Sequence, residues 1–253
     1  MNIVIIGSGN AAAVLGRKFR AAGHSIVQVL SRNATAASAL AYEWDTESAN
    51  YISLLNKQAD VYIIAVSDHA IAEVVKDLKL QGRVVAHTAG SVDKEVLKNV
   101  TAHYGVFYPL QSLRKETAGL PVTPLFFEGS DEKAARTLEH LAHSISFGQV
   151  TAANSLDRLK LHVAAVVVSN FTNHLYALAK TYCDKEGLDF TQLLPLIRET
   201  ALRVSDMAPA QAQTGPAIRH DRETIGKHLA LLDEHPSLQH IYRLMTESIQ
   251  QFN

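Results

Sequence analysis

A glycine-rich segment near the start of the chain has the residue types and the spacing that bind phosphate groups. Its residues are Gly7, Ser8, Gly9, Asn10, Ala11 and Ala12. The segment follows an apolar β-branched run, Asn2–Ile6, and opens an alanine-rich stretch with helical spacing, which is the context that a dinucleotide-binding motif requires. The first glycine then makes a tight turn, the second lets the backbone approach a pyrophosphate, and the alanine in the third position keeps helix and strand close. The helix amides bind the phosphates. The alternative is a glycine turn without a ligand.

The residues after the second predicted strand indicate which dinucleotide binds. NAD sites usually have an acidic residue there for the ribose hydroxyls, but this chain has Ser31, Arg32 and Asn33, and no acidic residue until Glu43. Arg32 offers a planar, charged fork to a 2′-phosphate, and Ser31 and Asn33 add neutral donors. A charge-assisted hydrogen bond of this kind contributes about 1.5–3 kcal/mol. We therefore predict NADP(H) as the cofactor, the alternative being that Arg32 is an ordinary surface arginine.

Two further predicted strands also end in polar residues, and ligands bind at the carboxyl ends of strands in a doubly wound sheet. The expected neighbours of the ribose and the nicotinamide are Val66, Ser67, Thr88 and Ala89. His87 has two readings. It could donate the proton that accompanies hydride transfer, because an unperturbed imidazole titrates near neutrality, or it could be a capping histidine bonded to the loop backbone.

A predicted long helix, Leu156–Thr181, carries a second set of candidates. At about 100° per residue, His162, Ser169 and Asn173 fall in a stripe about 40° wide, and Asn170 lies at the border of the apolar face. A polar row on an apolar helix is costly unless something uses it. We expect His162 to be a general acid and Asn170 or Asn173 to orient a carbonyl or carboxylate. The alternative is a dimer contact or an internally satisfied polar row.

Three more residues are candidate substrate ligands. Arg219 lies in a loop that contains glycine and proline, and it suits bidentate binding of a substrate carboxylate. Alternatively, Arg219 pairs with Asp221 or a helix end and fixes the loop. Tyr108 and Gln111 follow a predicted strand and are expected to wall the pocket.

Strands and helices alternate through the first 150 residues, and only helices follow. The predicted strands are Asn2–Ile6, Ser25–Leu30, Val61–Val66, Arg83–Ala86, Tyr104–Tyr108 and, as the last, Leu125–Glu128. The predicted helices between them are Asn10–Ala22, Ala34–Tyr42, Ala70–Leu78, Asp93–Val100 and Asp131–His143. After Leu156–Thr181 come the helices Phe190–Ala208, closed by Pro209, Asp221–Glu234 and Ser237–Phe252.

This order predicts an α/β Rossmann-like fold, with a doubly wound and mainly parallel sheet followed by an all-α C-terminal domain. We place the NADP-binding domain at residues 1–150 and the helical substrate and dimerisation domain at residues 151–253.

Composition excludes several classes of protein. The 253 residues include 24 Lys and Arg against 25 Asp and Glu, which argues against a nucleic-acid partner. No signal peptide is visible, and the longest later apolar run, Val163–Val168, is far shorter than the ~20 residues of a membrane span. A lone cysteine, Cys183, suits a cytoplasmic protein. His140 and His143 lie one helical turn apart without a third ligand, so no metal site is expected.

Together with the phosphate loop, three segments carry a resemblance to a known family: His87–Ser91, Gly105–Gln111 and Thr214–Asp221. The chain resembles the NADP-dependent oxidoreductases related to pyrroline-5-carboxylate reductase and the deazaflavin-dependent NADP reductases. It is most similar to a bacterial branch with a Rossmann-like domain and a C-terminal helical domain. The resemblance implies a homodimer with intertwined helical domains and a substrate near the domain cleft. Relatives often have glycine in place of His220, so the local turn can differ here.

The predicted function is reduction of a small carbonyl or imine substrate by NADPH, with His162, or failing that His87, delivering the proton. Some members of the branch look like 2-keto acid reductases, which makes a ketopantoate-like substrate one candidate. Two alternatives remain open. The chain could be a dehydrogenase of a small amino or hydroxy acid, or a non-catalytic NADP(H)-binding sensor.

Overall fold

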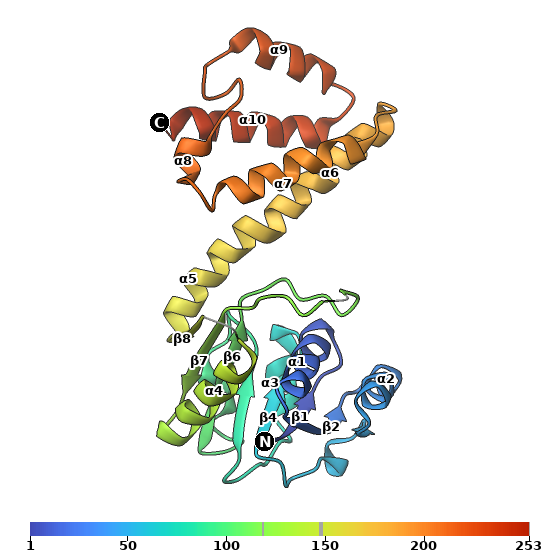
Figure 1. Ribbon diagram of the computed structural model, residues 1–253, viewed down its shortest axis with the longest axis vertical. Coiled ribbons are helices and arrows are strands. Elements are labelled where there is room, and N and C mark those ends of the chain that lie inside the picture. Colours follow the sequence, from blue (N-terminus) through green and yellow to red (C-terminus); the bar gives the residue numbers. More distant parts are fainter. Residues whose placement is uncertain (118, 147–148, 253) are drawn as a thin grey trace. The chain divides into compact units, whose positions relative to one another are not determined.

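The computed structural model describes residues 1–117, 119–146 and 149–252 (Figure 1). The chain folds as two compact units, Met1–Ser169 and Asn170–Asn253. Among the described residues, no helix has both the length and the apolar composition that a membrane span requires. The change from alternating strands and helices to helices alone occurs near residue 152, as predicted, whereas the compact units divide later. The domain boundary near residue 150 therefore stays a prediction.

The first unit contains one eight-stranded sheet in the order β3-β2-β1-β4-β5-β6-β7-β8. Strands β1 to β6 are parallel, β7 pairs antiparallel with β6, and β8 is parallel to β7. The strands are β1 Asn2–Ile6, β2 Ser25–Leu30, β3 Glu47–Ala49, β4 Val61–Ile64, β5 Val84–His87, β6 His103–Pro109, β7 Leu125–Gly129 and β8 Val150–Ala152. The mainly parallel, doubly wound sheet predicted from the sequence is confirmed.

The two outer strands of the sheet have no counterpart among the predicted ones. β3 and β8 have three residues each, and most of these residues are only partly buried or exposed. An edge strand pairs on one side only and buries little, so its sequence shows no apolar run or alternation. The prediction that Leu125–Glu128 is the last strand was wrong for this reason.

Helices cover both faces of the sheet, and the alternation within β1 shows why. Ile3 and Ile5 pack in one buried cluster, with helices α1, α2 and α4, while Val4 and Ile6 pack in a second cluster, with α3 and η2. The helices of this unit are α1 Asn10–Ala21, α2 Ala34–Trp44, η1 Ile52–Leu54, α3 Asp68–Val75, η2 Lys94–Leu97, α4 Glu132–Ile145 and α5 Ser155–Ala165. The predicted helix Asp93–Val100 is only the short 3₁₀ turn η2.

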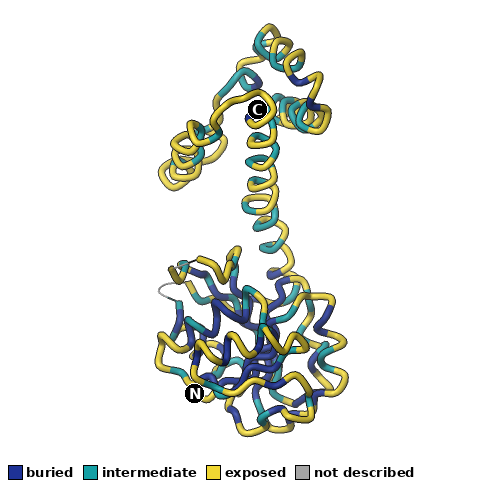
Figure 2. Tube along the Cα trace, turned by 90° about the vertical axis from the view of Figure 1, so that its right-hand side faces the viewer, coloured by how far each residue is buried: buried dark blue, intermediate teal, exposed yellow. Residues whose placement is uncertain are grey.

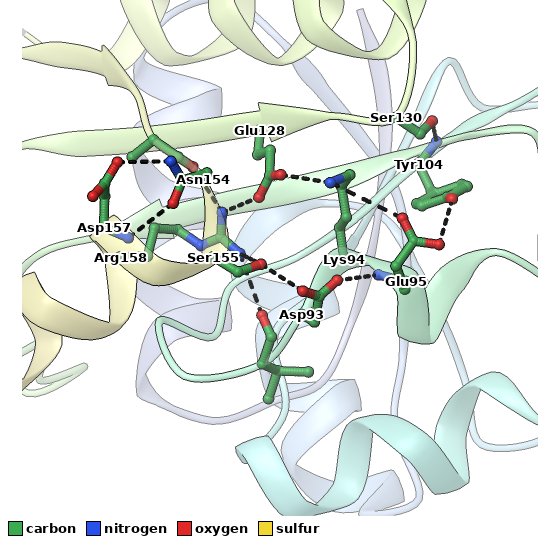
Figure 3. Close-up of polar contacts among 12 residues, drawn as sticks. Asp93, Lys94, Glu95, Tyr104, Glu128, Ser130, Asn154, Ser155, Asp157 and Arg158 are labelled. Atoms are coloured by element: carbon green, nitrogen blue, oxygen red, sulfur yellow. Dashed lines mark hydrogen bonds and ion pairs between the residues drawn. The ribbon is translucent and has the colours of Figure 1, made fainter.

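A buried ion pair attaches the start of α5 to the sheet (Figure 3). Arg158 is fully buried, and its Nη1 atom donates to the carboxylate of Glu128 on β7 and to the carbonyl of Ala153, 2.8 Å away. From the other side, Lys94 Nζ lies 2.5 Å from Glu128 Oε1. Ser155 at the start of α5 donates to Asp93 over 2.7 Å. Helix α5, strand β7 and the segment before η2 are thus held together by charged and polar groups.

The predicted long helix is observed, but it contains a π-helical segment. Helix α5 continues through η3 Val166–Phe171 into α6 Thr172–Lys185. A π-helical turn holds more residues than an α-helical turn. The predicted stripe of His162, Ser169 and Asn173 assumes 3.6 residues per turn throughout, and that assumption is wrong across η3.

The rest of the helical unit differs from the prediction near Pro209. The elements are η4 Phe190–Leu193, α7 Leu194–Arg203, α8 Pro209–Ala212, α9 Arg222–Leu231 and α10 Pro236–Gln251. The predicted helix Phe190–Ala208 is therefore a 3₁₀ turn followed by α7, which already ends at Arg203. Pro209 opens α8 instead of closing a helix, because proline lacks the N–H that the first turn does not use. His220 adopts a left-handed φ of 51°, which glycine adopts more readily.

The helical unit buries few of its apolar side chains (Figure 2). Within the described part of the chain, α7, α8, α9 and α10 contain no buried residue. Large apolar side chains are exposed in this unit, among them Phe171, Leu188, Leu196, Leu202, Val204, Leu231, Leu244, Met245 and Phe252. The apolar side chains of these helices are of the kind that packs in a hydrophobic core, but here they are exposed.

The buried ion pair leads to a testable prediction. Arg158→Ala should lower the free energy of unfolding of the first unit by about 1–3 kcal/mol, because Glu128 loses its guanidinium partner and keeps only Lys94, and the carbonyl of Ala153 loses its donor. The measurement is urea unfolding followed by the fluorescence of Trp44, which is buried in this unit. Lys160→Ala is the matched control, since Lys160 forms an exposed ion pair with Asp157 on the same helix and should change stability by less than ~1 kcal/mol. Equal effects of the two substitutions would contradict the prediction.

Candidate functional site

A cavity of about 600 Å³ lies at the carboxyl ends of β1, β2 and β4. In the sheet order, β1 stands between β2 and β4, so the chain direction of the crossovers reverses at this point. Doubly wound sheets bind their ligands at this reversal. The predicted cofactor residues that line the cavity are Gly7, Ser8, Gly9, Asn10, Ala11, Ser31, Arg32, Asn33, Val66 and Ser67.

The two glycines of the phosphate loop differ in what requires them. Gly7 has a φ of 127°, and a Cβ atom on it would lie 2.2 Å from the carbonyl oxygen of Ala65, so another residue fits only if the backbone moves. A Cβ atom on Gly9 would meet no atom within 4 Å, so the space beside Gly9 is open to a ligand. Ala12 is buried beneath the loop. Helix α1 begins at Asn10, and its first amides are available to phosphate groups. These residues fit the pyrophosphate of a dinucleotide.

At the end of β2, the side chains that were predicted to contact a 2′-phosphate are arranged around Arg32. Ser31 Oγ lies 2.8 Å from Ser8 Oγ, which connects this strand end to the phosphate loop. Asn33 caps helix α2, because its Oδ1 atom accepts from the amide of Ala36 over 3.0 Å. Arg32 is exposed at the cavity and, within the described structure, has no hydrogen-bond or ion-pair partner. Its guanidinium donors fit a 2′-phosphate.

At the end of β5, Thr88 and Ala89 do not line the cavity but are buried. The amide of Thr88 donates to the carbonyl of Ile64 on β4 over 3.1 Å, which fixes the two strand ends side by side. The predicted contact of Thr88 and Ala89 with a nicotinamide stays a prediction.

His87 is completely buried and bonded to backbone groups on both sides of its ring. Its Nδ1 atom accepts from the amide of Ala89 over 3.2 Å, so Nε2 carries the proton and faces the carbonyl of Asp93 at 3.4 Å. Burial is the main cause that lowers the pKa of His87 to about 4. This geometry corresponds to the capping alternative, in which a neutral histidine holds the loop after β5.

His162 and Tyr108 meet, although they are 54 residues apart in the sequence. Tyr108, 7% exposed at the end of β6, has its Oη atom 3.2 Å from Nδ1 of His162, and the two rings form an edge contact with centroids 6.2 Å apart. The ring of Tyr108 lies against Gly90, where a Cβ atom would come within 2.7 Å of it. A buried strand tyrosine and a partly exposed helix histidine are thus joined at the carboxyl edge of the sheet.

Asp68 and Ser91 belong to the same edge of the sheet and were missed by the sequence reasoning. Ser91 Oγ donates to the carboxylate of Asp68 at the start of α3. Burial and, secondly, the charge of Asp68 raise the pKa of the Tyr108 phenol above its ordinary value. The phenol therefore keeps its proton at neutral pH. A signal was available, because Asp68 directly follows the predicted cofactor residue Ser67.

The remaining predicted substrate residues are not brought together with this pair by any described contact. Gln111 uses its amide within its own loop, donating to the carbonyl of Val122 over 3.0 Å. Asn170, Asn173 and Arg219 are exposed residues of the helical unit. Arg219 helps to lower the pKa of Asp221, after the hydrogen bonds from Thr224, so both readings of Arg219 stay open. Among the described residues, no three His, Cys, Asp or Glu side chains are grouped to hold a metal ion.

Two family models match separate parts of the chain. Residues 2–90 match the family described as NADP oxidoreductase, coenzyme F420-dependent, and residues 123–249 match a domain of unknown function, DUF2520. A search of the curated proteins found no match.

Solved structures match over almost the whole chain. A Bacteroides fragilis protein, provisionally named NADP oxidoreductase BF3122, is 39% identical, with a TM-score of 0.91 over 99% of this chain and 98% of that one. Protein TM1727 from Thermotoga maritima is 22% identical, with a TM-score of 0.81 over 98% of each chain. The 1-pyrroline-5-carboxylate reductase from Streptococcus pyogenes is 15% identical, with a TM-score of 0.64 over 99% and 98%. The last two likenesses show a shared fold.

The buried state of His87 predicts a pH dependence of stability. Its folded pKa of about 4 is below the ordinary value of 6.5, so between these values the unfolded chain binds more protons than the folded one. Stability should therefore fall as the pH falls from 6.5 to 4, by up to about 3 kcal/mol from this group. Urea unfolding of wild type and His87→Gln at several pH values measures this, and the variant should lose that part of the slope. His69→Gln, an exposed histidine, is the control. An unchanged slope in His87→Gln would disprove the assignment.

Proposed function

The chain belongs to a family of NADP oxidoreductases, and we propose that it reduces a small carbonyl or imine substrate with NADPH, using His162 and Tyr108 to deliver the proton. The family relationship rests on the relative from Bacteroides fragilis and on the two matched domains. It agrees with the resemblance, the enzyme class and the NADP(H) cofactor expected from the sequence.

The observation that carries the proposal is the contact between Tyr108 Oη and His162 Nδ1. When bound, NADPH supplies the hydride that the substrate carbon accepts. The oxygen or nitrogen of the substrate must then take up a proton. Tyr108 keeps its phenolic proton, because burial and Asp68 raise its pKa, and it can donate that proton to the substrate. His162 contacts the phenol oxygen through Nδ1 and can replace the proton along this hydrogen bond.

The alternatives are distinguished by the polar groups at this edge. A non-catalytic sensor needs no proton donor, whereas here a phenol and an imidazole are in contact at the carboxyl edge of the sheet. A dehydrogenase working in the oxidative direction would use the same pair with the proton moving the other way. The pyrroline-5-carboxylate reductase fold makes cyclic imines reasonable substrates, and the ketopantoate-like keto acids remain candidates. Asn170, Asn173 and Arg219 are proposed substrate ligands, and Gln111 a wall of the pocket.

The test is a substrate screen followed by two matched variants. NADPH oxidation is measured with 2-keto acids, ketopantoate first, and with cyclic imines. For the best substrate, Tyr108→Phe and His162→Gln should lower kcat/KM by about 100-fold or more, which is the usual contribution of a general acid, and leave the Kd of NADPH unchanged. Tyr104→Phe is the control, because Tyr104 lies on the same strand with its hydroxyl on Glu95. Tight NADPH binding without turnover of any substrate would favour the sensor. Full activity of both variants would reject the proton donors.

We also propose a cytoplasmic homodimer, formed through the helical unit. The support is the set of large apolar side chains that this unit leaves exposed, including Leu196 and Leu202 on α7. An exposed apolar surface of this extent is typical of a protein interface, and a second copy of the unit supplies a matching one.

The dimer is tested by the mass in solution. Sedimentation equilibrium should give twice the chain mass of 27.6 kDa, and Leu196→Asp together with Leu202→Asp should shift the protein towards the monomer, because two charges would be buried at the interface. Leu54→Asp, on an exposed leucine of the first unit, should leave the mass unchanged. A wild-type protein that is monomeric would contradict the proposal.

A further inference from the structure

The cavity beyond the phosphate loop is lined by charges of opposite sign. Arg32 follows β2, whereas Glu73 lies on α3 and Asp77 in the turn after it, and all three line the same cavity. Other lining side chains are apolar, such as Ile52 and Val74, and suit the adenine ring of a dinucleotide. The cavity wall that includes the Arg32 guanidinium therefore also includes carboxylates.

The positive charge of Arg32 acts on the Glu73 carboxyl, although less than that of Lys76. The pKa of its carboxyl lies below the ordinary value, chiefly because Lys76 Nζ donates to it over 2.6 Å, and Arg32 acts in the same direction. Glu73 is thus ionised at neutral pH and attracts the guanidinium that a 2′-phosphate needs. Glu73 lines the cavity even though it pairs with Lys76, and both side chains of this pair are exposed to solvent.

We propose that Glu73 is a specificity-determining residue, which competes with the 2′-phosphate of NADP(H) for Arg32. A phosphate monoester carries a charge of about −1.5 to −2 at pH 7, whereas NAD(H) has a neutral hydroxyl at the same position. Glu73 therefore weakens the binding of NADP(H) and leaves that of NAD(H) unchanged, and it sets the ratio of the two affinities together with Arg32. A weakened phosphate site also releases the spent cofactor more readily, a step that often limits turnover.

This inference rests on cofactor binding by the family and not on the proposed reaction. It is tested by titration of the purified protein with NADPH and NADH, followed by cofactor fluorescence or calorimetry. A failure to turn over any substrate would leave the titrations interpretable, so the two proposals can fail separately.

The experiment is a double-mutant cycle of Glu73→Gln and Arg32→Ala. Glu73→Gln should tighten NADPH binding about two- to fivefold, the range for exposed charge pairs, without changing the Kd of NADH. Arg32→Ala should weaken NADPH binding about tenfold or more. In the Arg32→Ala background, the gain from Glu73→Gln should disappear, because there is no guanidinium to compete for. An unchanged NADPH affinity in Glu73→Gln, or an equal gain for NADH, would overturn the proposal, as would a gain that persists without Arg32.

Two controls exclude other origins of the gain. Glu73→Gln also frees Lys76, so Glu73→Gln is combined with Lys76→Gln, and the gain should remain. If it vanishes, the released ammonium explains the effect and the proposal fails. Glu132→Gln is the matched control elsewhere, because Glu132 is an exposed helix glutamate that pairs with Arg136 and does not line the cavity. An equal gain in Glu132→Gln would indicate a general effect of net charge and would also overturn the proposal.

Discussion

The buried ion pair between Arg158 and Glu128 is the interaction on which the candidate catalytic pair depends. A buried guanidinium is tolerated only when it is paired, and here a carboxylate, two carbonyls and a hydroxyl accept from the two terminal nitrogens of Arg158, while its buried Nε has no hydrogen-bond partner in the described structure. His162 follows Arg158 by four residues, so both side chains lie on the same side of α5. Holding Arg158 against β7 therefore also holds His162 beside Tyr108 at the end of the neighbouring strand β6.

The parallel sheet brings the cofactor cavity and this pair to one edge. Strands β1 to β6 run in the same direction, so their carboxyl ends meet at one edge of the sheet. This edge carries the phosphate loop after β1, the loop after β5 that His87 caps, and Tyr108 near the end of β6. Two glycines at this edge are required because neighbouring groups lie too close to leave room for a side chain. Gly7 lies against the backbone of Ala65, and Gly90 lies against the ring of Tyr108. A nicotinamide at the end of β4 and a proton donor at the end of β6 are compatible with this arrangement.

Charge is used locally in a chain that is almost neutral overall. Arg158 is neutralised by a buried carboxylate and has a structural role. Arg32 stays exposed at the cavity, where a phosphate can reach it. The Glu73 carboxylate lines the same cavity, and the charge of Arg32 acts on it. Burial, and secondly the charge of Asp68, raises the pKa of the Tyr108 phenol. Burial thus separates the two arginines. Arg158 is buried and paired with a carboxylate, whereas Arg32 is exposed at the cavity and available to a ligand.

The sequence by itself determined the features that depend on neighbouring residues. The phosphate loop, the buried parallel strands, the long helix and the expectation of NADP(H) as the cofactor all follow from residue types, local spacing and periodicity. Contacts between distant residues were decided by the tertiary structure alone. Nothing in the sequence shows that His162 meets Tyr108, that Glu73 and Arg32 line the same cavity, or that His87 is buried and neutral, because these depend on how strands and helices pack. The edge strands β3 and β8 were missed for a related reason, since they are stabilised by pairing and have no apolar pattern of their own, and the apolar residues of η3 do not distinguish a π-helical turn from an α-helical one.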